Sequence, residues 1–288
     1  MLVKARSGVG WGPRSGFAGR GAGLHQTRRE NANQDRACAW SVEKTAVGRH
    51  SMPLLRSRRF TRALTPAAFQ KGQALIDDQS LRELLLLHAP LRPLPLLPSM
   101  RAFHAQDELG LWMALEAASG SRLGAPFFAV AWPGAQALAK AISDGAVAVR
   151  GKRVVDLGCG SGIGAVAAAL AGAKVVAVDV DPLALGCTRL LAVEHGVSVE
   201  TRVGDVGDEW VVGDAEVVLA GDVVYNVDLG VAFSASVRVW RAQGRTLVLA
   251  DSGRPFFDAG DLQQRLLFEV DVPRALEGVS RRVVRVYF

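Results

Sequence analysis

The feature that most constrains the fold is a glycine-rich turn between a short apolar run and the start of a helical pattern. Residues 154–164 read VVDLGCGSGIG, so glycine occupies every second position from 158 to 164. Glycine is needed where a backbone takes a left-handed conformation or approaches a ligand closely, because it has no Cβ. The segment therefore predicts a parallel β-strand, a tight turn and a helix, the repeating unit of open α/β sheets.

Short apolar runs and helical patterns then alternate to the end of the chain. We expect strands at 153–157, 174–179, 199–203, 215–221 and 246–250, and helices at 163–171, 182–194 and 227–241. Two further runs, 267–272 and 282–288, are too close for a helical crossover, which indicates an antiparallel pair at one edge. The predicted fold class is α/β: a Rossmann-like, seven-stranded, mostly parallel sheet with an antiparallel C-terminal edge hairpin, preceded by a helical N-terminal lead-in.

Composition divides the chain into three parts. Residues 1–60 are rich in Arg, Gly and Ser, and predict a flexible basic arm. Residues 61–150 predict a helical lead-in and a lid over cofactor or substrate, with helices at 65–88 and 107–118 separated by a proline-rich connector. Residues 151–288 are expected to form the core that binds the cofactor.

Charge and cysteine usage exclude several classes of function. The formal net charge of +6 lies wholly in residues 1–50, and residues 51–288 carry 25 charges of each sign, so no nucleic-acid partner is expected. No apolar run reaches the ~18–20 residues of a membrane span, and the three cysteines have neither zinc-site nor disulfide spacing. We expect a cytoplasmic protein without a resident metal, or a mitochondrial matrix protein if the basic arm is a transit peptide.

Three aspartates near strand ends indicate a nucleotide-type cofactor. Asp179 ends the second strand, 21 residues after Gly158, where a carboxylate can accept both ribose hydroxyls of an adenosine. Asp205 follows the third strand and is placed to meet the adenine amino group. Asp156 precedes the first glycine, where it would repel a pyrophosphate and attract an ammonium group. Together with the turn backbone at Gly158 and Gly160, this pattern favours S-adenosylmethionine.

Two alternatives to that cofactor stay open. The spacing Gly160-x-Gly162-x-x-Ala165 also satisfies the loose dinucleotide fingerprint, which is compatible with a nicotinamide or flavin cofactor. A glycine turn that binds no ligand is the other alternative.

The order of these motifs resembles one large enzyme family. An Asp-x-Gly-x-Gly turn, an aspartate at the second strand end and a Gly-Asp pair after the third strand resemble class I, seven-β-strand S-adenosylmethionine-dependent methyltransferases over about residues 150–288. After the fourth strand, Asp222-x-x-Tyr225 resembles the lysine-directed branch, and the N-P-P-Y motif of nucleic-acid amino-methyltransferases is missing there.

Further segments resemble the electron-transfer flavoprotein β-subunit lysine methyltransferase family. Residues 127–138, FFAVAWPGAQAL, look like the segment before the glycine turn in that family, which carries W-[PA]-G-G-Q-A-L. Residues 250–254, ADSGR, look like its G-D-P-G-R turn. The resemblance covers about residues 90–288. Ala135, Ala250 and Ser252 depart from the family pattern, and Ala135 is expected to narrow the pocket entrance.

The resemblance implies roles for particular residues. Asp222 would orient the acceptor amine by a hydrogen bond, and Tyr225 would line the channel. Trp132 would line the cofactor pocket, unless it is a core tryptophan. Arg254 could dock an acidic group of the partner.

The implied function is protein-lysine N-methylation of the electron-transfer flavoprotein β subunit or a similar protein. A methyltransferase for a ribosomal protein or a small molecule is the first alternative. A nicotinamide-dependent oxidoreductase or a non-catalytic adenosyl-binding protein is the alternative of a different class.

Overall fold

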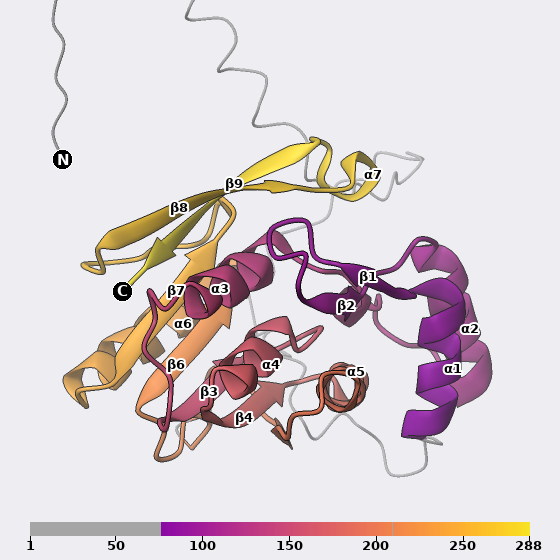
Figure 1. Ribbon diagram of the computed structural model, residues 1–288, viewed down its shortest axis with the longest axis horizontal. Helices are drawn as coiled ribbons and strands as arrows, with labels where there is room; N and C mark the ends of the chain where they lie inside the picture. The colour runs from indigo at the N-terminus through magenta and orange to yellow at the C-terminus, as the bar shows by residue number, and fades with distance from the viewer. Residues whose placement is uncertain (1–75, 209) are drawn as a thin grey trace, which may run out of the picture. The chain divides into compact units, whose positions relative to one another are not determined.

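The computed structural model describes residues 76–208 and 210–288, and their central element is a sheet of seven strands (Figure 1). The predicted basic arm at 1–60 and the beginning of the lead-in at 61–75 lie outside the described residues. The strand order is β5-β4-β3-β6-β7-β9-β8. The strands are β3 (Arg153–Leu157), β4 (Lys174–Asp179), β5 (Glu200–Val203), β6 (Val217–Gly221), β7 (Thr246–Asp251), β8 (Gln264–Asp271) and β9 (Arg281–Tyr287).

Pairing within the sheet confirms the predicted fold class. The strands from β5 to β7 are parallel, whereas β9 runs antiparallel to both β7 and β8. Strand order reverses between β3 and β6, and ligands of open α/β sheets bind at such a switch point, beyond the carboxyl ends of the strands. The glycine-rich turn after β3 therefore lies at the expected binding edge.

Helices cover both faces of the sheet, as an α/β fold requires. In Figure 1, α3, α4 and α5 lie on one face and α6 on the other. Side chains alternate accordingly: on β3, Val154 packs into the core shared with α3, α4 and α5, whereas Val155 packs into the core that includes Phe233 and Trp240 of α6. These helices are α3 (Pro133–Ser143), α4 (Ile163–Leu170), α5 (Pro182–Glu194) and α6 (Val227–Ala242).

The lead-in consists of two capped helices and a small hairpin. Asp77 caps α1 (Asp78–His88) and Asp107 caps α2 (Glu108–Ser119), each accepting a bond from the backbone N–H three residues later. The helix expected at 65–88 is thus confirmed over Asp78–His88. The hairpin of β1 (Leu91–Pro93) and β2 (Arg101–Phe103) was not predicted, since three-residue strands beside prolines show no clear periodicity.

Two short elements carry residues of the candidate active site. The 3-10 helix η2 (Phe127–Ala129) precedes α3, and α7 (Arg274–Glu277) lies in the connection between β8 and β9. Neither was predicted, nor was α3, although proline at its first position suits a helix start. None of the helices in the described parts of the chain is long and apolar enough to cross a membrane.

Candidate active site

The turn after β3 requires glycine at three positions. Gly158, Gly160 and Gly162 have φ values of 62°, 48° and 78°, in the left-handed region that side chains other than glycine rarely adopt. A Cβ on Gly162 would lie 2.6 Å from the Thr188 hydroxyl oxygen. The turn therefore presents bare backbone at the carboxyl edge of the sheet.

Asp156 lies beneath this turn, against the first turn of α4. Asp156 is only 3% exposed, and a Cβ on Gly164 would lie 2.9 Å from the Asp156 Oδ2. Burial raises the pKa of Asp156 to about 7, although a hydrogen bond from the Ala165 backbone favours the ionised form. The carboxylate thus occupies the positive end of the helix, where a pyrophosphate would need the same backbone donors.

Asp179 connects the end of β4 to the glycine turn. Its Oδ2 accepts a hydrogen bond of 2.9 Å from the Gly160 backbone N–H, and its Oδ1 accepts one of 3.0 Å from that of Asp181. Burial raises the pKa of Asp179, and these backbone donors oppose the rise. The side chain therefore stands beside the bare backbone of the turn, as predicted for a ribose-binding acid.

Asp205 and Tyr225 share the electrostatic environment of Asp179. Asp205 is half-buried after β5, with its backbone N–H donating to the Asp208 carboxylate at 3.0 Å. Desolvation, followed by the negative charges of Asp179 and Asp205, raises the pKa of Tyr225. Tyr225 is nevertheless 59% exposed, so its ring faces solvent at the same edge. The structure thus brings three predicted site residues together.

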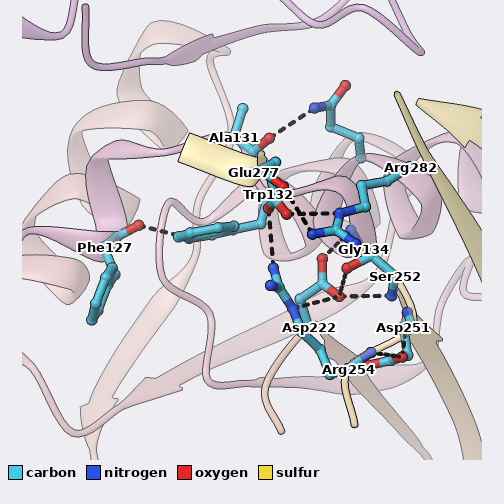
Figure 2. Close-up of polar contacts among 12 residues, drawn as sticks. Phe127, Ala131, Trp132, Gly134, Asp222, Asp251, Ser252, Arg254, Glu277 and Arg282 are labelled. Carbon is cyan, nitrogen blue, oxygen red and sulfur yellow. Dashed lines mark hydrogen bonds and ion pairs between the residues drawn. The ribbon is translucent and has the colours of Figure 1, made fainter. Parts of the chain in front are cut away.

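Asp222 faces inward from the end of β6. Its side chain is 2% exposed; Oδ2 accepts a hydrogen bond of 2.7 Å from the Gly134 N–H, and Oδ1 accepts bonds of 2.8 Å from both the backbone N–H and the hydroxyl of Ser252 (Figure 2). Its φ of 54° makes it the one non-glycine residue with a positive φ in the described part of the chain. Such strain gathers at functional sites, where neighbouring contacts hold it in place.

Arg254 does not point to solvent, so the expectation that it docks a partner is wrong. Its side chain is 15% exposed, and its Nη2 donates to Glu277 Oε1 at 3.2 Å. Its Nε lies 3.8 Å from Asp222 Oδ1, and its guanidinium carbon lies 5.3 Å from the Trp132 ring centroid. Because α7 places the Glu277 carboxylate next to the Arg254 guanidinium, the arginine is paired with a negative charge inside the protein (Figure 2).

Glu277 is a site-forming residue that sequence reasoning missed. It is 4% exposed and also accepts a hydrogen bond of 2.8 Å from Arg282 Nε. No spacing or motif marks it, because its partners come from a different connection and strand. It fixes Arg254 between itself and Asp222.

Trp132 is half-buried, between Arg254 and Phe127. Its indole Nε1–H donates to the Phe127 carbonyl at 2.9 Å, and the two ring centroids are 6.1 Å apart. Phe127 in turn lies 6.4 Å from the Tyr225 ring. Sequence reasoning assigned no role to Phe127, although it belongs to the segment that resembles a known family.

Known proteins similar to this chain are methyltransferases. The family model for ribosomal protein L11 methyltransferase (PrmA) matches residues 139–226. The electron transfer flavoprotein beta subunit lysine methyltransferase of Homo sapiens is 33% identical over 149 residues, which cover 49% of this chain and 55% of that protein. The Xenopus laevis protein of the same name is 28% identical over 225 residues, covering 74% and 88%. The chain thus spans about half the length of the human relative.

One solved structure that this chain is similar to is the magnesium protoporphyrin IX methyltransferase of Synechocystis PCC 6803. It is 18% identical, with a TM-score of 0.39, and the match covers 52% of this chain and 76% of that chain.

Proposed function

We propose that this chain transfers a methyl group from S-adenosylmethionine to a protein lysine. Its relatives confirm the predicted resemblance to the electron-transfer flavoprotein β-subunit lysine methyltransferases. The observation that carries the proposal is the buried Asp156 of β3, which lies against the first turn of α4. A carboxylate there suits the ammonium of a methionyl group and opposes a diphosphate. This argues against the nicotinamide-dependent alternative.

We propose a cofactor site on the basis of these contacts. The backbone of Gly158 and Gly160, with Asp156, would hold the methionyl end of S-adenosylmethionine, because a cradle without Cβ atoms lets the ligand approach closely. Asp179 would accept the ribose hydroxyls and Asp205 would meet the adenine amino group.

Trp132 would close the pocket on the side of α3. The bound cofactor supplies an electrophilic methyl group on a sulfonium.

The task of the chain is then alignment and delivery of a neutral amine. Alignment of reacting atoms alone can lower a barrier by about 7–11 kcal/mol. A free lysine has a pKa near 10.4, so its ammonium must lose a proton before or during binding. Tyr225, whose pKa is raised, stays protonated at neutral pH and can exchange hydrogen bonds with the incoming amine.

Asp222 is assigned a positioning function. These contacts do not test the predicted hydrogen bond in which Asp222 accepts from the amine, and three donors already occupy its oxygens. We therefore assign to Asp222 the task of fixing Gly134 and Ser252, and through them the Trp132 loop, beside the acceptor.

The names of the relatives support two candidate protein substrates. The electron-transfer flavoprotein β subunit is the first candidate. Ribosomal protein L11 is the second, because the family model that matches residues 139–226 describes methyltransferases of that protein. We propose a cytoplasmic location, or the mitochondrial matrix if the basic arm directs import.

Mass spectrometry tests the proposed function. The full-length chain is incubated with S-adenosylmethionine and either the β subunit or ribosomal protein L11 from the same organism, and the peptides are sequenced. Increments of one, two or three methyl groups on a lysine of the β subunit are expected, and none when the cofactor is omitted. Increments on L11 alone would favour the second candidate, and no increment on either protein would contradict the substrate assignment.

A further inference from the structure

Three aromatic rings form a group at the carboxyl edge of the sheet, which we call the aromatic group: Phe127, Trp132 and Tyr225. Phe127 lies between the other two, with centroid distances of 6.1 Å to Trp132 and 6.4 Å to Tyr225. The interplanar angles of 59° and 46° leave the rings tilted rather than stacked flat. Phe127 is 60% exposed, about as much as Tyr225, so both rings are accessible from solvent.

Two large aromatic side chains that are exposed side by side form an apolar surface that a ligand can cover. The cofactor residue Asp156 is almost fully buried, whereas the faces of Phe127 and Tyr225 are open. A small cofactor would be enclosed by the turn, but a side chain of another protein must arrive from solvent. The aromatic group is therefore placed to receive the acceptor.

Contacts inside the protein already hold these rings in position. The Trp132 indole donates to the Phe127 carbonyl, which ties the two residues together. Arg254 lies 5.3 Å from the Trp132 centroid, in the range of a cation–π interaction, so this ring already binds one cation. Glu277 and Asp222 balance the charge of that arginine. A second cation next to Phe127 thus meets rings that need little rearrangement.

Charge at this edge also favours a cation. The carboxylates of Asp179 and Asp205 both act on the Tyr225 hydroxyl, which means that negative charge lies close to the open rings. Aromatic faces attract ammonium groups within ~6 Å of a centroid, and methylated ammonium groups are held in the same way.

We propose that Phe127, together with Tyr225 and the exposed part of Trp132, binds the amino group of the acceptor lysine and the methylated ammonium groups that methyl transfer produces. The inference rests on the proposed function and names the residues that recognise its substrate. When the methyl group is transferred, the amine lone pair forms the new N–C bond and the electron pair of the broken S–C bond returns to sulfur. Positive charge therefore passes to the nitrogen, and rings around that nitrogen stabilise it there.

Binding of tetramethylammonium tests this site without any methyl transfer. The full-length chain, with and without excess S-adenosylhomocysteine, is titrated with tetramethylammonium chloride at constant ionic strength, and the methyl proton resonance is followed by NMR. We expect saturable binding of tetramethylammonium and no binding of tert-butanol, a neutral molecule of similar size. Phe127→Leu should weaken the binding about two- to fivefold, and Phe127→Tyr should restore it.

A matched control is Phe256→Leu, which removes an exposed phenylalanine outside the aromatic group and should leave binding unchanged. The site is overturned if tetramethylammonium binds equally well to the parent and to Phe127→Leu, or if it does not saturate at all.

A second measurement separates the acceptor from the cofactor as the source of the cation. Calorimetry should give the same affinities of the parent and Phe127→Leu for S-adenosylmethionine and for S-adenosylhomocysteine. A selective loss for S-adenosylmethionine would mean that the ring holds the sulfonium. An equal loss for both would mean that Phe127 belongs to the cofactor pocket, and either result overturns the proposal.

Failure of this inference and failure of the proposed function give different results. If lysine methylation is observed but the affinity for tetramethylammonium does not depend on Phe127, the proposed aromatic site is wrong and the proposed activity stands. If the binding depends on Phe127 but no lysine is methylated, the cation site stands and the proposed activity is wrong.

Discussion

The Asp222 carboxylate accepts a hydrogen bond of 2.7 Å from the backbone N–H of Gly134, 88 residues earlier in the chain. The bond joins the carboxyl end of β6 to the first turn of α3, the helix that follows Trp132. Helix starts leave backbone N–H groups without partners, and a carboxylate satisfies one of them. The position of Trp132 at the site therefore depends on a contact between segments that are distant in sequence.

Substitution of Gly134 by alanine tests this contact. A Cβ there would lie 2.7 Å from the Asp222 backbone nitrogen and 3.0 Å from the Ala250 carbonyl oxygen, and neither backbone atom can move easily. We expect Gly134→Ala to lower the free energy of unfolding by about 1–3 kcal/mol, measured by urea denaturation. Gly124→Ala is the matched control, because a Cβ at Gly124 meets nothing within 4 Å. Equal stabilities of the two variants would contradict the close contact of Gly134 with the backbone of Asp222 and Ala250.

Removal of the Glu277 charge should loosen the Arg254 turn. Glu277→Gln keeps the shape of the side chain but weakens its bonds to Arg254 and Arg282, which lie largely out of solvent. We expect a loss of about 1.5–3 kcal/mol in unfolding free energy. The exposed pair of Glu269 and Arg281 provides the comparison, and Glu269→Gln should change stability by less than about 0.5 kcal/mol. An equal effect of the two substitutions would show that the buried ion pairs of Glu277 stabilise the protein no more than the exposed pair of Glu269.

Much of the fold was predictable because its signals are local. The apolar run of β3 and the aspartate cap of α5 are visible in the sequence, and the structure confirms the elements they indicate. The aspartates near strand ends were found for a related reason: parallel strands place their carboxyl ends at one edge. Asp156 and Asp179, near the ends of β3 and β4, and Asp205, after β5, therefore lie toward that edge.

The remaining parts of the site depend on contacts that no local pattern reveals. Glu277 reaches Arg254 because a four-residue helix turns it inward, and Phe127 meets Tyr225 because η2 and the end of β6 lie at the same edge. The inward orientation of Arg254 was missed because an arginine in a turn is usually exposed. The start of α3 could have been found from Pro133, but its sequence was interpreted only as a family motif.

The Asp156 carboxylate should make stability depend on pH. Its pKa in the folded protein is about 7, raised by burial from the usual 3.8, so the folded state binds this proton more tightly than the unfolded state. The stabilisation is complete below pH 3.8 and is lost as the pH rises through 7, by at most about 1.4 kcal/mol per pH unit. Asp156→Asn removes this titration. The melting temperature of the variant, relative to the parent, should therefore rise between pH 5 and pH 7.5, whereas a constant difference would contradict the buried position.

Binding of S-adenosylhomocysteine tests directly whether Asp156 binds the ammonium group of the cofactor. Titration calorimetry at pH 8 compares S-adenosylhomocysteine with NAD on the parent chain and on Asp156→Asn. We expect the parent chain to bind S-adenosylhomocysteine but not NAD. Asp156→Asn should bind S-adenosylhomocysteine at least about tenfold more weakly, because the variant lacks the negative charge that pairs with the ammonium group. Binding of NAD by the parent, or equal affinity of parent and variant for S-adenosylhomocysteine, would contradict these expectations.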